Sequence, residues 1–196
     1  MTSSAEKFAF TPDYEEKAKG YIARYPEGRQ FSAVMPLLDL AQRQNGGWLS
    51  QPAMDYVAGY LQMPPIRVYE VATFYTMYNL KPVGKVHVRV CTTTPCWLRG
   101  SDDVVGACKK VLGIGMGETT EDGMFTLDEV ECAGACVNAP VIQVGDDYYE
   151  DLDAASTEAL LEAFKRGDTV KTGPQIDRQT SAPEGGAKTL QEVGEG

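Results

Sequence analysis

The sequence is short of basic side chains and nearly lacks histidine. It contains 18 lysine and arginine residues against 28 aspartate and glutamate residues, with one histidine and a formal net charge of −10. A nucleic-acid-binding surface needs a basic face, so this balance argues against nucleic acid as a partner. The same negative charge argues against binding to an anionic membrane surface.

Long hydrophobic runs are also missing. No stretch approaches the roughly 18 consecutive apolar residues of a membrane-spanning helix, so we expect no direct insertion into a membrane. The first residues, MTSSAEKFAFTPD, lack the basic and apolar segments of a secretion signal and do not resemble an arginine-rich transit peptide. We therefore predict a cytoplasmic bacterial protein, in a compartment where thiols stay reduced.

The cysteines need a role other than disulfide bonding. There are five of them, an odd number that a disulfide framework would leave unbalanced. A chain of 196 residues can also bury a core without such cross-links. Four of the cysteines form two pairs, Cys91-x4-Cys96 and Cys132-x3-Cys136.

Residues 11–80 carry the spacing and the start signals of four short helices. Prolines mark three of the starts: Thr11-Pro12, Ser50 with Pro52, and Pro64-Pro65. The remaining helix is expected from near Ser32 to Gln44. We therefore predict a small helical module over residues 11–80.

The pattern then changes to strands that alternate with helices, which predicts a second domain over residues 84–167. Strands are expected at 86–91 and 125–130, a hairpin at 140–150, and helices at 101–112 and 153–164. Residues 168–196 hold few large apolar side chains, so we predict a flexible tail there. The predicted fold class is α+β or α/β, with an N-terminal helical bundle ahead of the sheet-containing domain.

Each cysteine pair begins where a predicted strand ends. Loops that follow strand ends gather at one edge of the sheet in α/β domains, so the two pairs are expected to meet. Thiolates are soft ligands that select Zn²⁺, Cu(I) or iron–sulfur clusters. Structural zinc sites also use cysteine pairs with two to four intervening residues, so the spacing alone leaves zinc open.

Several other cysteine chemistries do not fit. The plant-type ferredoxin spacing would place a cysteine where Arg99 stands, and a Rieske centre needs two histidines where the chain has only His87. We expect His87 to be an ordinary strand residue. Neither pair has the Cys-x-x-Cys spacing of a redox dithiol. The fifth cysteine, Cys108, shares a helical face with Val104 and is expected to be buried rather than a ligand.

The segments Cys91-Thr-Thr-Thr-Pro-Cys96 and Cys132-Ala-Gly-Ala-Cys136-Val-Asn-Ala-Pro140 resemble the thioredoxin-like [2Fe–2S] ferredoxin family. The stretches 37–44 and 68–77 are similar to the members that serve NADH-quinone oxidoreductase, respiratory complex I. The resemblance covers about residues 10–166. It implies a helical bundle followed by a thioredoxin-like domain. It also implies one [2Fe–2S] cluster held by the cysteines of the two pairs: Cys91, Cys96, Cys132 and Cys136.

The same resemblance implies an electron-transfer subunit with no substrate site and no catalytic residue of its own. Single electrons would be exchanged with the FMN of a partner flavoprotein subunit, which also binds NADH, beside a neighbouring iron–sulfur subunit. The glycines of Gly113-Ile-Gly115-Met-Gly117 do not follow a strand, so we expect a loop there and no NAD site. The protein would sit peripherally on the cytoplasmic face of the bacterial inner membrane, through the complex.

Other assemblies and other chemistries remain open at this point. The equivalent subunit of an NAD-linked hydrogenase or formate dehydrogenase would carry the same module. A zinc-stapled interaction module would use the same cysteines without redox chemistry. Short helices joined by turns also invite a helix-turn-helix reading, which the negative charge disfavours. Finally, apolar side chains over residues 74–78 exceed what a small bundle needs, which predicts a docking surface.

Overall fold

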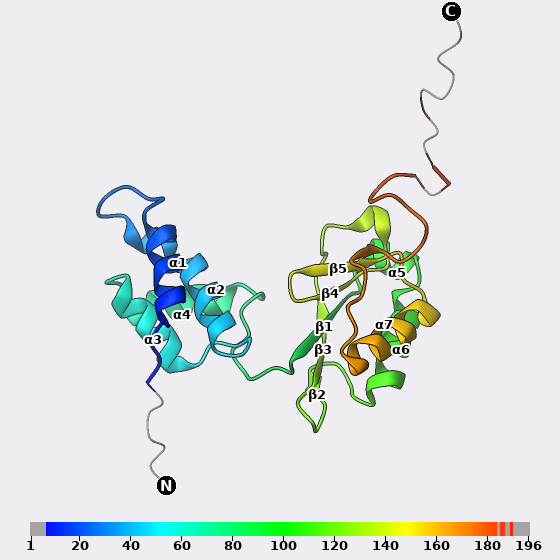
Figure 1. The fold of residues 1–196 in the computed structure, drawn as a ribbon, viewed down its shortest axis with the longest axis horizontal. Coiled ribbons are helices and arrows are strands. Elements are labelled where there is room, and N and C mark those ends of the chain that lie inside the picture. Colours follow the sequence, from blue (N-terminus) through cyan, green and yellow to red (C-terminus); the bar gives the residue numbers. More distant parts are fainter. Residues whose placement is uncertain (1–6, 184, 187–188, 190–196) are drawn as a thin grey trace, which may run out of the picture. The chain divides into compact units, whose positions relative to one another are not determined.

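The computed structural model describes residues 7–183, 185–186 and 189. The chain divides into two compact units, Met1–Val83 and Gly84–Gly196. The first is helical and the second contains the sheet, as Figure 1 shows by the blue-to-cyan and the green-to-red ribbon. No helix within the described residues is long and apolar enough to span a membrane.

The helices of the first unit begin where the sequence signals predict. Three have a proline as their first or second residue: α1 (Pro12–Ile22), α3 (Gln51–Tyr60) and α4 (Pro65–Phe74). At α3, the hydroxyl oxygen of Ser50 accepts a hydrogen bond from the N–H of Ala53 at 3.3 Å, which satisfies one of the free donors of the first turn. The helix expected from near Ser32 is split into a 3₁₀ turn, η1 (Gln30–Ala33), and α2 (Val34–Gln44).

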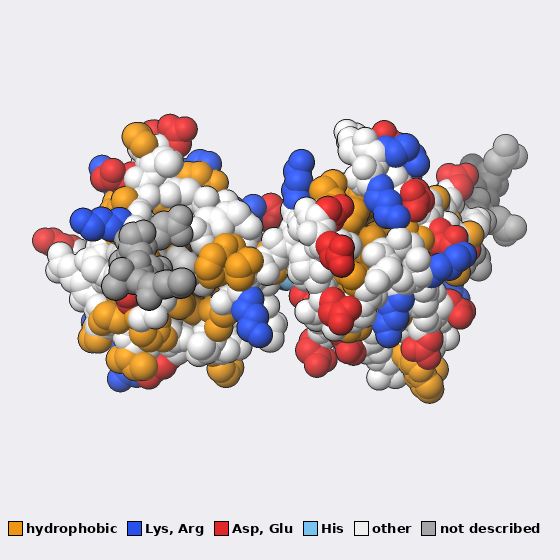
Figure 2. All heavy atoms as spheres, turned by 90° about the horizontal axis from the view of Figure 1, so that it is seen from below, with side chains coloured by type: hydrophobic (Ala, Val, Ile, Leu, Met, Phe, Trp, Pro, Cys, Tyr) orange, Lys and Arg blue, Asp and Glu red, His pale blue; other side chains and the backbone are white. Residues whose placement is uncertain are grey.

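One face of each helix forms the core of the first unit. Leu37 and Leu38 of α2 are fully buried, with Val57 of α3 and Val68 of α4. Four aromatic rings pack together beside this core, mostly edge to face: Phe8, Phe10, Tyr56 and Tyr60. Hydrophobic side chains still reach the surface of this unit, at left in Figure 2, whereas acidic and basic side chains intersperse over the second unit.

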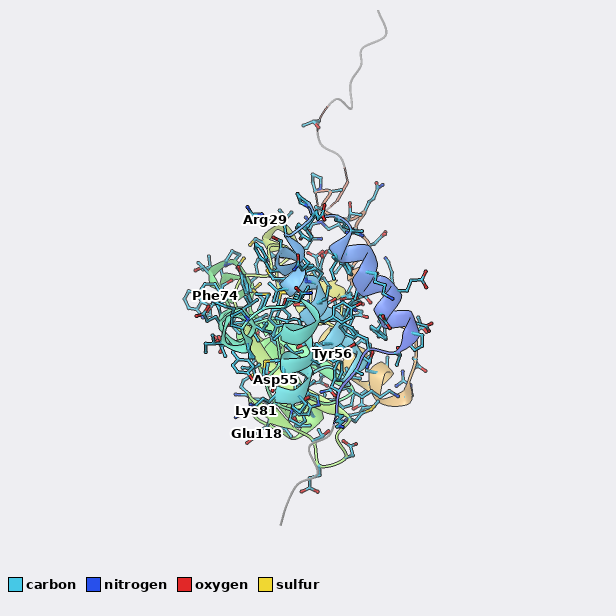
Figure 3. The ribbon with its side chains drawn as sticks, turned by 90° about the vertical axis from the view of Figure 1, so that its left-hand side faces the viewer. Arg29, Asp55, Tyr56, Phe74, Lys81 and Glu118 are labelled. Atoms are coloured by element: carbon cyan, nitrogen blue, oxygen red, sulfur yellow. The ribbon has the colours of Figure 1, made fainter. Side chains whose placement is uncertain are left out.

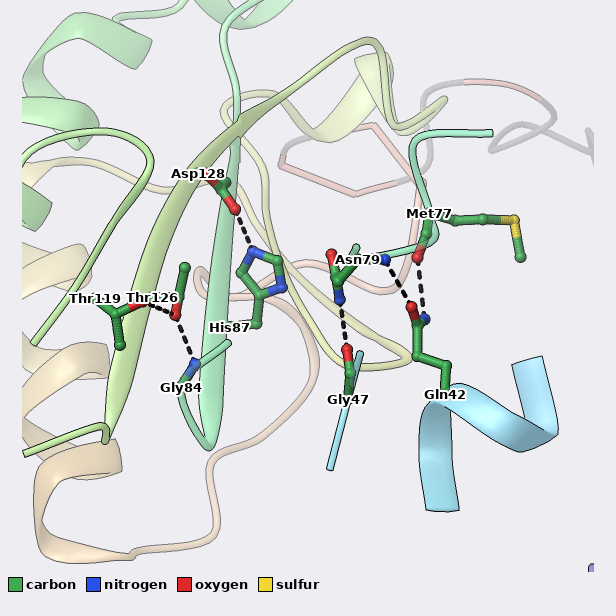
Figure 4. A network of polar contacts seen from close by, with 9 residues as sticks. All are labelled: Gln42, Gly47, Met77, Asn79, Gly84, His87, Thr119, Thr126 and Asp128. Atoms are coloured by element: carbon green, nitrogen blue, oxygen red, sulfur yellow. Dashed lines mark hydrogen bonds and ion pairs between the residues drawn. The ribbon is translucent and has the colours of Figure 1, made fainter. Parts of the chain in front are cut away.

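The segment after α4 is fixed by α2 while it keeps apolar side chains outside. Phe74 lies at the outer rim of the helical unit in Figure 3, and its side chain is 76 % exposed. Gln42 of α2 donates to the carbonyl of Met77 at 3.1 Å and accepts from the N–H of Asn79 at 2.7 Å (Figure 4). Phe74 ends α4 and the segment that follows it is anchored, so its exposure does not come from a loosely held backbone.

In the described part of the second unit, a six-stranded sheet has the order β2-β3-β1-β4-β5-β6. Its strands are β1 (Val86–Cys91), β2 (Glu118–Thr119), β3 (Phe125–Val130), β4 (Ile142–Val144), β5 (Asp147–Glu150) and β6 (Gly173–Pro174). β1 pairs in parallel with β3 and antiparallel with β4, and β4 and β5 form the predicted hairpin. The strands predicted at 86–91 and 125–130 are confirmed.

A glycine fixes the register of β1 on β3. The N–H of Gly84 donates to the hydroxyl of Thr126 at 2.6 Å, as Figure 4 shows. A Cβ added at Gly84 would lie 2.6 Å from the carbonyl carbon of Phe125, so a larger residue could not approach β3 this closely. In the resulting register, Cys91 lies opposite Val130, and the two strands end together.

Helices α6 (Ser101–Leu112) and α7 (Ala154–Arg166) pack on each other beside the sheet (Figure 1). Asp153 caps α7 in a reciprocal pair of hydrogen bonds with Ser156, and Gly167 ends it. Between β1 and α6 the structure has a short helix that the sequence pattern does not predict, α5 (Thr94–Leu98). Five residues are too few to show a periodic pattern, which is why the sequence did not reveal it.

Part of the segment predicted to be a flexible tail packs on the second unit. β6 pairs in parallel with β5, and the N–H of Gln175 donates to the carbonyl of Glu150 at 2.9 Å. Farther on, Arg178 forms a buried ion pair with Asp151. The low apolar content of the segment misled the prediction, because backbone pairing and a buried ion pair hold it in place. Residues 184, 187–188 and 190–196 of the predicted tail lie outside the described residues.

Candidate functional site

The parallel pairing of β1 and β3 brings the two cysteine pairs to one edge of the sheet. Cys91 is the last residue of β1, and its partner Val130 ends β3 two positions before Cys132. The hydroxyl of Thr93 lies 3.4 Å from the sulfur of Cys91 and also contacts the thiol of Cys132. The meeting of the two pairs that the sequence predicted is therefore present.

The first pair is buried and held by regular structure. Cys91 and Cys96 are each 2 % exposed. The N–H of Cys91 donates to the carbonyl of Val141 at 3.1 Å, so the residue is fixed from both neighbouring strands. Cys96 lies on α5, and Ala139 and Val141 pack against both thiols.

The second pair is exposed and lies on irregular backbone. The sulfurs of Cys132 and Cys136 are 3.3 Å apart, and both residues are exposed. The loop between them is held at Ala133, whose carbonyl accepts a hydrogen bond from the hydroxyl of Tyr148 at 3.0 Å. Cys136 begins a single 3₁₀ turn, η2 (Cys136–Asn138).

One thiol of each pair is favoured as a thiolate. Burial opposes ionisation of Cys91, but hydrogen bonds from Thr93 and from the N–H of Ala133 outweigh it and lower the pKa of this thiol. The N–H of Gly134, followed by the thiol of Cys136, lowers the pKa of Cys132. Hydrogen bonds to sulfur favour its charged form, which is the form that binds metal.

The other thiol of each pair retains its proton. Burial, followed by the neighbouring Cys91, raises the pKa of Cys96 to about 12. The hydrogen bond with Cys132 raises the pKa of Cys136. Since metal ligands must be deprotonated, these two thiols would lose their protons on binding a metal.

The donor set fits an iron–sulfur cluster. Four thiols from two strand ends lie together, and cysteine thiolates are the usual ligands of [2Fe–2S] clusters. Small side chains, Ala133, Ala135 and Ala139, border the thiols. Among the described residues, no three His, Cys, Asp or Glu side chains already stand at metal-binding distances from one point, so the fit rests on the chemistry of the four thiols.

Two residues that the sequence set aside lie away from the thiols. Cys108 is fully buried in the core on the inner face of α6, and burial raises its pKa to about 12. His87 points its Nε2 at a carboxylate oxygen of Asp128 at 2.6 Å (Figure 4), so its partner is an acid of the adjacent strand. The glycines at 113–117 lie in the loop that follows α6, as expected.

Exposed apolar side chains adjoin one cysteine of each pair in sequence. Trp97 and Leu98 of α5 follow the buried Cys96, and Val137 follows the exposed Cys136. In the helical unit, Phe74, Tyr75 and Met77 are exposed, in agreement with the predicted docking surface. Tyr78 is instead buried and donates from its hydroxyl to the carbonyl of Met35 at 2.9 Å, so its inclusion in that surface was wrong.

Sequence reasoning missed the residues that support the second pair. Tyr148 bonds to Ala133, Arg178 to Val137, and Asp151 accepts from Asn138. Nothing in the local sequence of Tyr148, Asp151 or Arg178 marks them, because each acts on residues distant along the chain. Asn138 itself lies within the second cysteine motif.

Comparison with known proteins gives consistent matches over most of the chain. The family model of the thioredoxin-like [2Fe–2S] ferredoxin matches residues 18–165. The E subunit of NADH-quinone oxidoreductase from Rickettsia bellii (strain RML369-C) is 57 % identical over 165 residues, which covers 84 % of this chain and 99 % of that protein. The mitochondrial NADH dehydrogenase [ubiquinone] flavoprotein 2 of Dictyostelium discoideum is 52 % identical over 185 residues, covering 94 % of this chain and 75 % of that protein.

Among solved structures, an NAD⁺-reducing [NiFe]-hydrogenase in the air-oxidized state has a similar fold. The TM-score is 0.60 at 20 % sequence identity, and the match covers 69 % of this chain and 23 % of that chain. At this identity the likeness concerns the fold alone.

Proposed function

This chain belongs to the thioredoxin-like [2Fe–2S] ferredoxin family, and from that premise we propose that it is the electron-carrying E subunit of an NADH-quinone oxidoreductase. It carries one [2Fe–2S] cluster and exchanges single electrons within an oxidoreductase complex. Its cluster ligands are Cys91, Cys96, Cys132 and Cys136. It has no substrate site of its own.

The observation that carries the ligand assignment is the shared end of β1 and β3. The register that places Cys91 opposite Val130 brings two thiol pairs together that residues 97–131 separate in sequence. Cys108 is the one cysteine that this register does not bring to the edge, and it is buried in the core. The four remaining thiols form a ligand set without an extra or a missing member.

When bound, the cluster supplies a one-electron redox centre. The chain supplies four thiolates. Reduction by one electron makes the total charge of the cluster and its thiolates more negative by one unit. N–H and hydroxyl donors toward sulfur, such as Thr93 and Gly134, favour the more negative reduced form. Burial of Cys91 and Cys96 acts in the opposite sense, because a low dielectric disfavours charge. The protein thus sets the reduction potential through these two opposing contributions.

The partner we propose is a flavoprotein subunit that binds NADH and FMN, with a neighbouring iron–sulfur subunit in the same complex. The names of the relatives support this assignment. The exposed apolar side chains that follow Cys96 and Cys136 in sequence, Trp97, Leu98 and Val137, suit a covered interface. Through the complex, the subunit would lie on the cytoplasmic face of the bacterial inner membrane.

An NAD-linked hydrogenase or formate dehydrogenase is the second candidate assembly. The similar fold of the NAD⁺-reducing hydrogenase is consistent with this alternative. Identity of 57 % to 62 % with E subunits of quinone-linked enzymes favours the first. Affinity purification of the full chain from its native cells decides between them. Co-purified quinone-linked membrane subunits support the proposal, and a hydrogenase or formate dehydrogenase subunit contradicts it.

Spectroscopy of the purified full chain tests the cofactor. Iron and acid-labile sulfide should each assay at about two per chain, and the dithionite-reduced protein should give the EPR signal of a single [2Fe–2S] cluster. A colourless protein with about one zinc per chain would instead establish the zinc-stapled module.

The helical docking surface is tested in the assembled enzyme. Replacing Phe74 and Met77 by serine should weaken co-purification of the partner subunits while the cluster signal stays, because both side chains are exposed. Tyr25→Ser, at another exposed aromatic of the same unit, is the matched control. Unchanged partner binding in the Phe74/Met77 variant would remove this surface from the proposal.

A further inference from the structure

The C-terminal segment is clamped to the turn that begins with Cys136. Arg178 donates from Nη1 to a carboxylate oxygen of Asp151 at 2.8 Å and to the carbonyl of Val137 at 3.2 Å. The side chains of Arg178 and Asp151 are only 8 % and 4 % exposed, so this is no surface ion pair. Because Val137 directly follows Cys136, the guanidinium group bonds the backbone beside a thiol.

Asn138 extends the same network to the rest of the turn. Its Nδ2 donates to the second carboxylate oxygen of Asp151 at 3.1 Å and to the carbonyl of Thr180 at 2.9 Å. The N–H of Asp151 returns a hydrogen bond to the carbonyl of Asn138 at 2.7 Å. The turn, the end of β5 and the C-terminal segment therefore share one buried set of hydrogen bonds.

The backbone at Asp151 shows how strongly this network constrains the chain. Asp151 has φ of +53°, a left-handed conformation that residues other than glycine seldom adopt. Such a conformation persists where the surroundings hold it. Both carboxylate oxygens and the N–H of Asp151 form hydrogen bonds. The C-terminal segment is also held next to it, because β6 pairs with β5, which ends at the preceding residue.

Stability alone is a weak reason for a buried ion pair here. Desolvation of two charges offsets most of their attraction, and apolar residues of similar size often stabilise a fold as well. What the guanidinium group provides is direction, since its planar set of donors fixes the geometry of its partners. Those partners are the carbonyl after Cys136 and the carboxylate that orients Asn138. The first thiol pair needs no such support, because β1 and α5 hold it.

We propose that Arg178 is a positioning residue for the cluster. Together with Asp151 and Asn138 it fixes the turn Cys136–Asn138, so that the C-terminal segment sets how firmly the exposed thiol pair holds iron. The proposal rests on the assignment of Cys136 as a ligand under the proposed function. It assigns to residues 173–182 a role in holding the cofactor.

The test is the rate at which the loaded full-length chain loses its cluster to an iron chelator, followed by visible absorbance. Arg178→Met should lose the cluster about tenfold faster than the wild type, since residues that orient metal ligands typically affect affinity by about 10–100-fold. The g values of the reduced cluster should shift in the same variant. Arg178→Lys should recover part of the slow rate, because it restores the charge without the planar donors.

Two control variants separate positioning from general stability. Arg166→Met removes the exposed pair with Asp168 and should leave the rate unchanged. Leu161→Ala lowers the thermal stability of the same unit from the core, and should leave the EPR g values unchanged. An Arg178→Met rate and spectrum equal to the wild type would overturn the proposal, as would the same g-value shift in Leu161→Ala.

A measurement on the unaltered chain covers the case in which Arg178→Met does not fold. Coupling is reciprocal, so if the segment tightens the cluster site, the bound cluster must tighten the segment. Exchange of the Gln175 amide hydrogen, measured relative to amides within α7, should be slower in the loaded than in the metal-free protein. Equal relative exchange in the two forms overturns the proposal.

Failure of this proposal and failure of the proposed function give different results. If the wild type holds one [2Fe–2S] cluster that Cys136→Ser loses, and Arg178→Met still matches the wild type, only the positioning role of Arg178 falls. If the wild type binds no cluster, or Cys136→Ser retains it unaltered, the ligand assignment falls first.

Discussion

The two thiol pairs differ in how the fold holds them. Cys91 and Cys96 are buried on a strand and a helix, whereas Cys132 and Cys136 are exposed on a loop and a single turn. Support for the first pair comes from main-chain pairing. Support for the second comes from distant side chains, Tyr148 and Arg178, that bond to its loop and turn. The two halves of the site are thus held by different means.

Cysteine-to-serine variants should show this difference most strongly. Each of Cys91, Cys96, Cys132 and Cys136 should lose or badly destabilise the cluster when replaced, because a serine oxygen is a harder donor than a thiolate. In the metal-free protein, replacements in the two pairs should differ in their cost to folding stability. Cys96→Ser should cost about 1–3 kcal/mol for a buried hydroxyl, whereas Cys132→Ser should stay within about 0.5 kcal/mol. Iron content and urea unfolding measure the two effects.

Cys108→Ser is the control for this series. It should keep the cluster and its EPR signal, at a stability cost of about 1–3 kcal/mol for a buried hydroxyl. A Cys108→Ser variant without cluster, beside one of the other four with an unaltered spectrum, would contradict the ligand assignment.

Removal of the C-terminal segment should remove support from the second thiol pair and leave the support of the first pair in place. A chain that ends at Gly167 loses the pairing of β6 and leaves Asp151 without Arg178. We expect a loss of about 1–3 kcal/mol, below the cost of an ion pair broken in a closed site, because water reaches Asp151 once the segment is gone. Thermal unfolding measures it, and a chain that ends at Gly186 serves as the control. Equal melting temperatures for the two chains would show that the segment contributes no stability.

A smaller change probes the hydroxyl that reaches both halves. Thr93→Val removes a hydrogen bond to the sulfur of Cys91 without a change of shape. Such a bond is worth about 0.5–1.5 kcal/mol, or roughly 20–60 mV for one electron. The midpoint potential should fall by at most that amount, because both redox forms lose the donor and the more negative reduced form loses the stronger bond. Thr92→Val, whose hydroxyl donates to Glu129 instead, should leave the potential in place; an equal fall in both variants would disprove the role of Thr93.

The smallest effect concerns acid and the strand that carries Cys91. Burial, followed by Arg89, lowers the pKa of His87 below its ordinary 6.5 despite the hydrogen bond with Asp128. As the pH falls, His87 therefore takes up a proton near pH 6.5 in the unfolded chain, whereas in the folded chain it stays neutral to a lower pH. Stability is complete above that pH and declines as the pH falls toward the lowered value. Urea unfolding of the metal-free chain at several pH values should show this decline, and His87→Gln should reduce it.

The strands and the first thiol pair were open to prediction because their signals are local. Alternation marked Val86–Cys91 and Phe125–Val130, and the cysteine spacing marked the site. Parallel pairing then required only the rule that strand ends share an edge. The glycine that fixes the register, Gly84, was not identified, since its role depends on the backbone of Phe125 across the sheet.

The residues that support the second pair could not be predicted, because their contacts are not local in sequence. Arg178 lies 27 residues after Asp151, in a segment whose composition resembles a disordered tail. A few directed hydrogen bonds hold this segment although it buries little apolar area. A pattern of hydrophobic residues does not reveal such bonds. Helix α5 escaped because five residues span little more than one turn.

The order of the ligands along the chain has a consequence for synthesis. A ribosome that has made β1 and α5 has delivered two thiols but no site, because the site closes only when β3 pairs with β1. Between Cys91 and Cys136 lie residues 92–135, which take roughly 2–9 seconds at about 5–20 residues per second. Arg178 emerges later still. Iron that arrives before Cys136 has been made meets an incomplete set of thiols, so all four thiolates are available only once synthesis has passed residue 136.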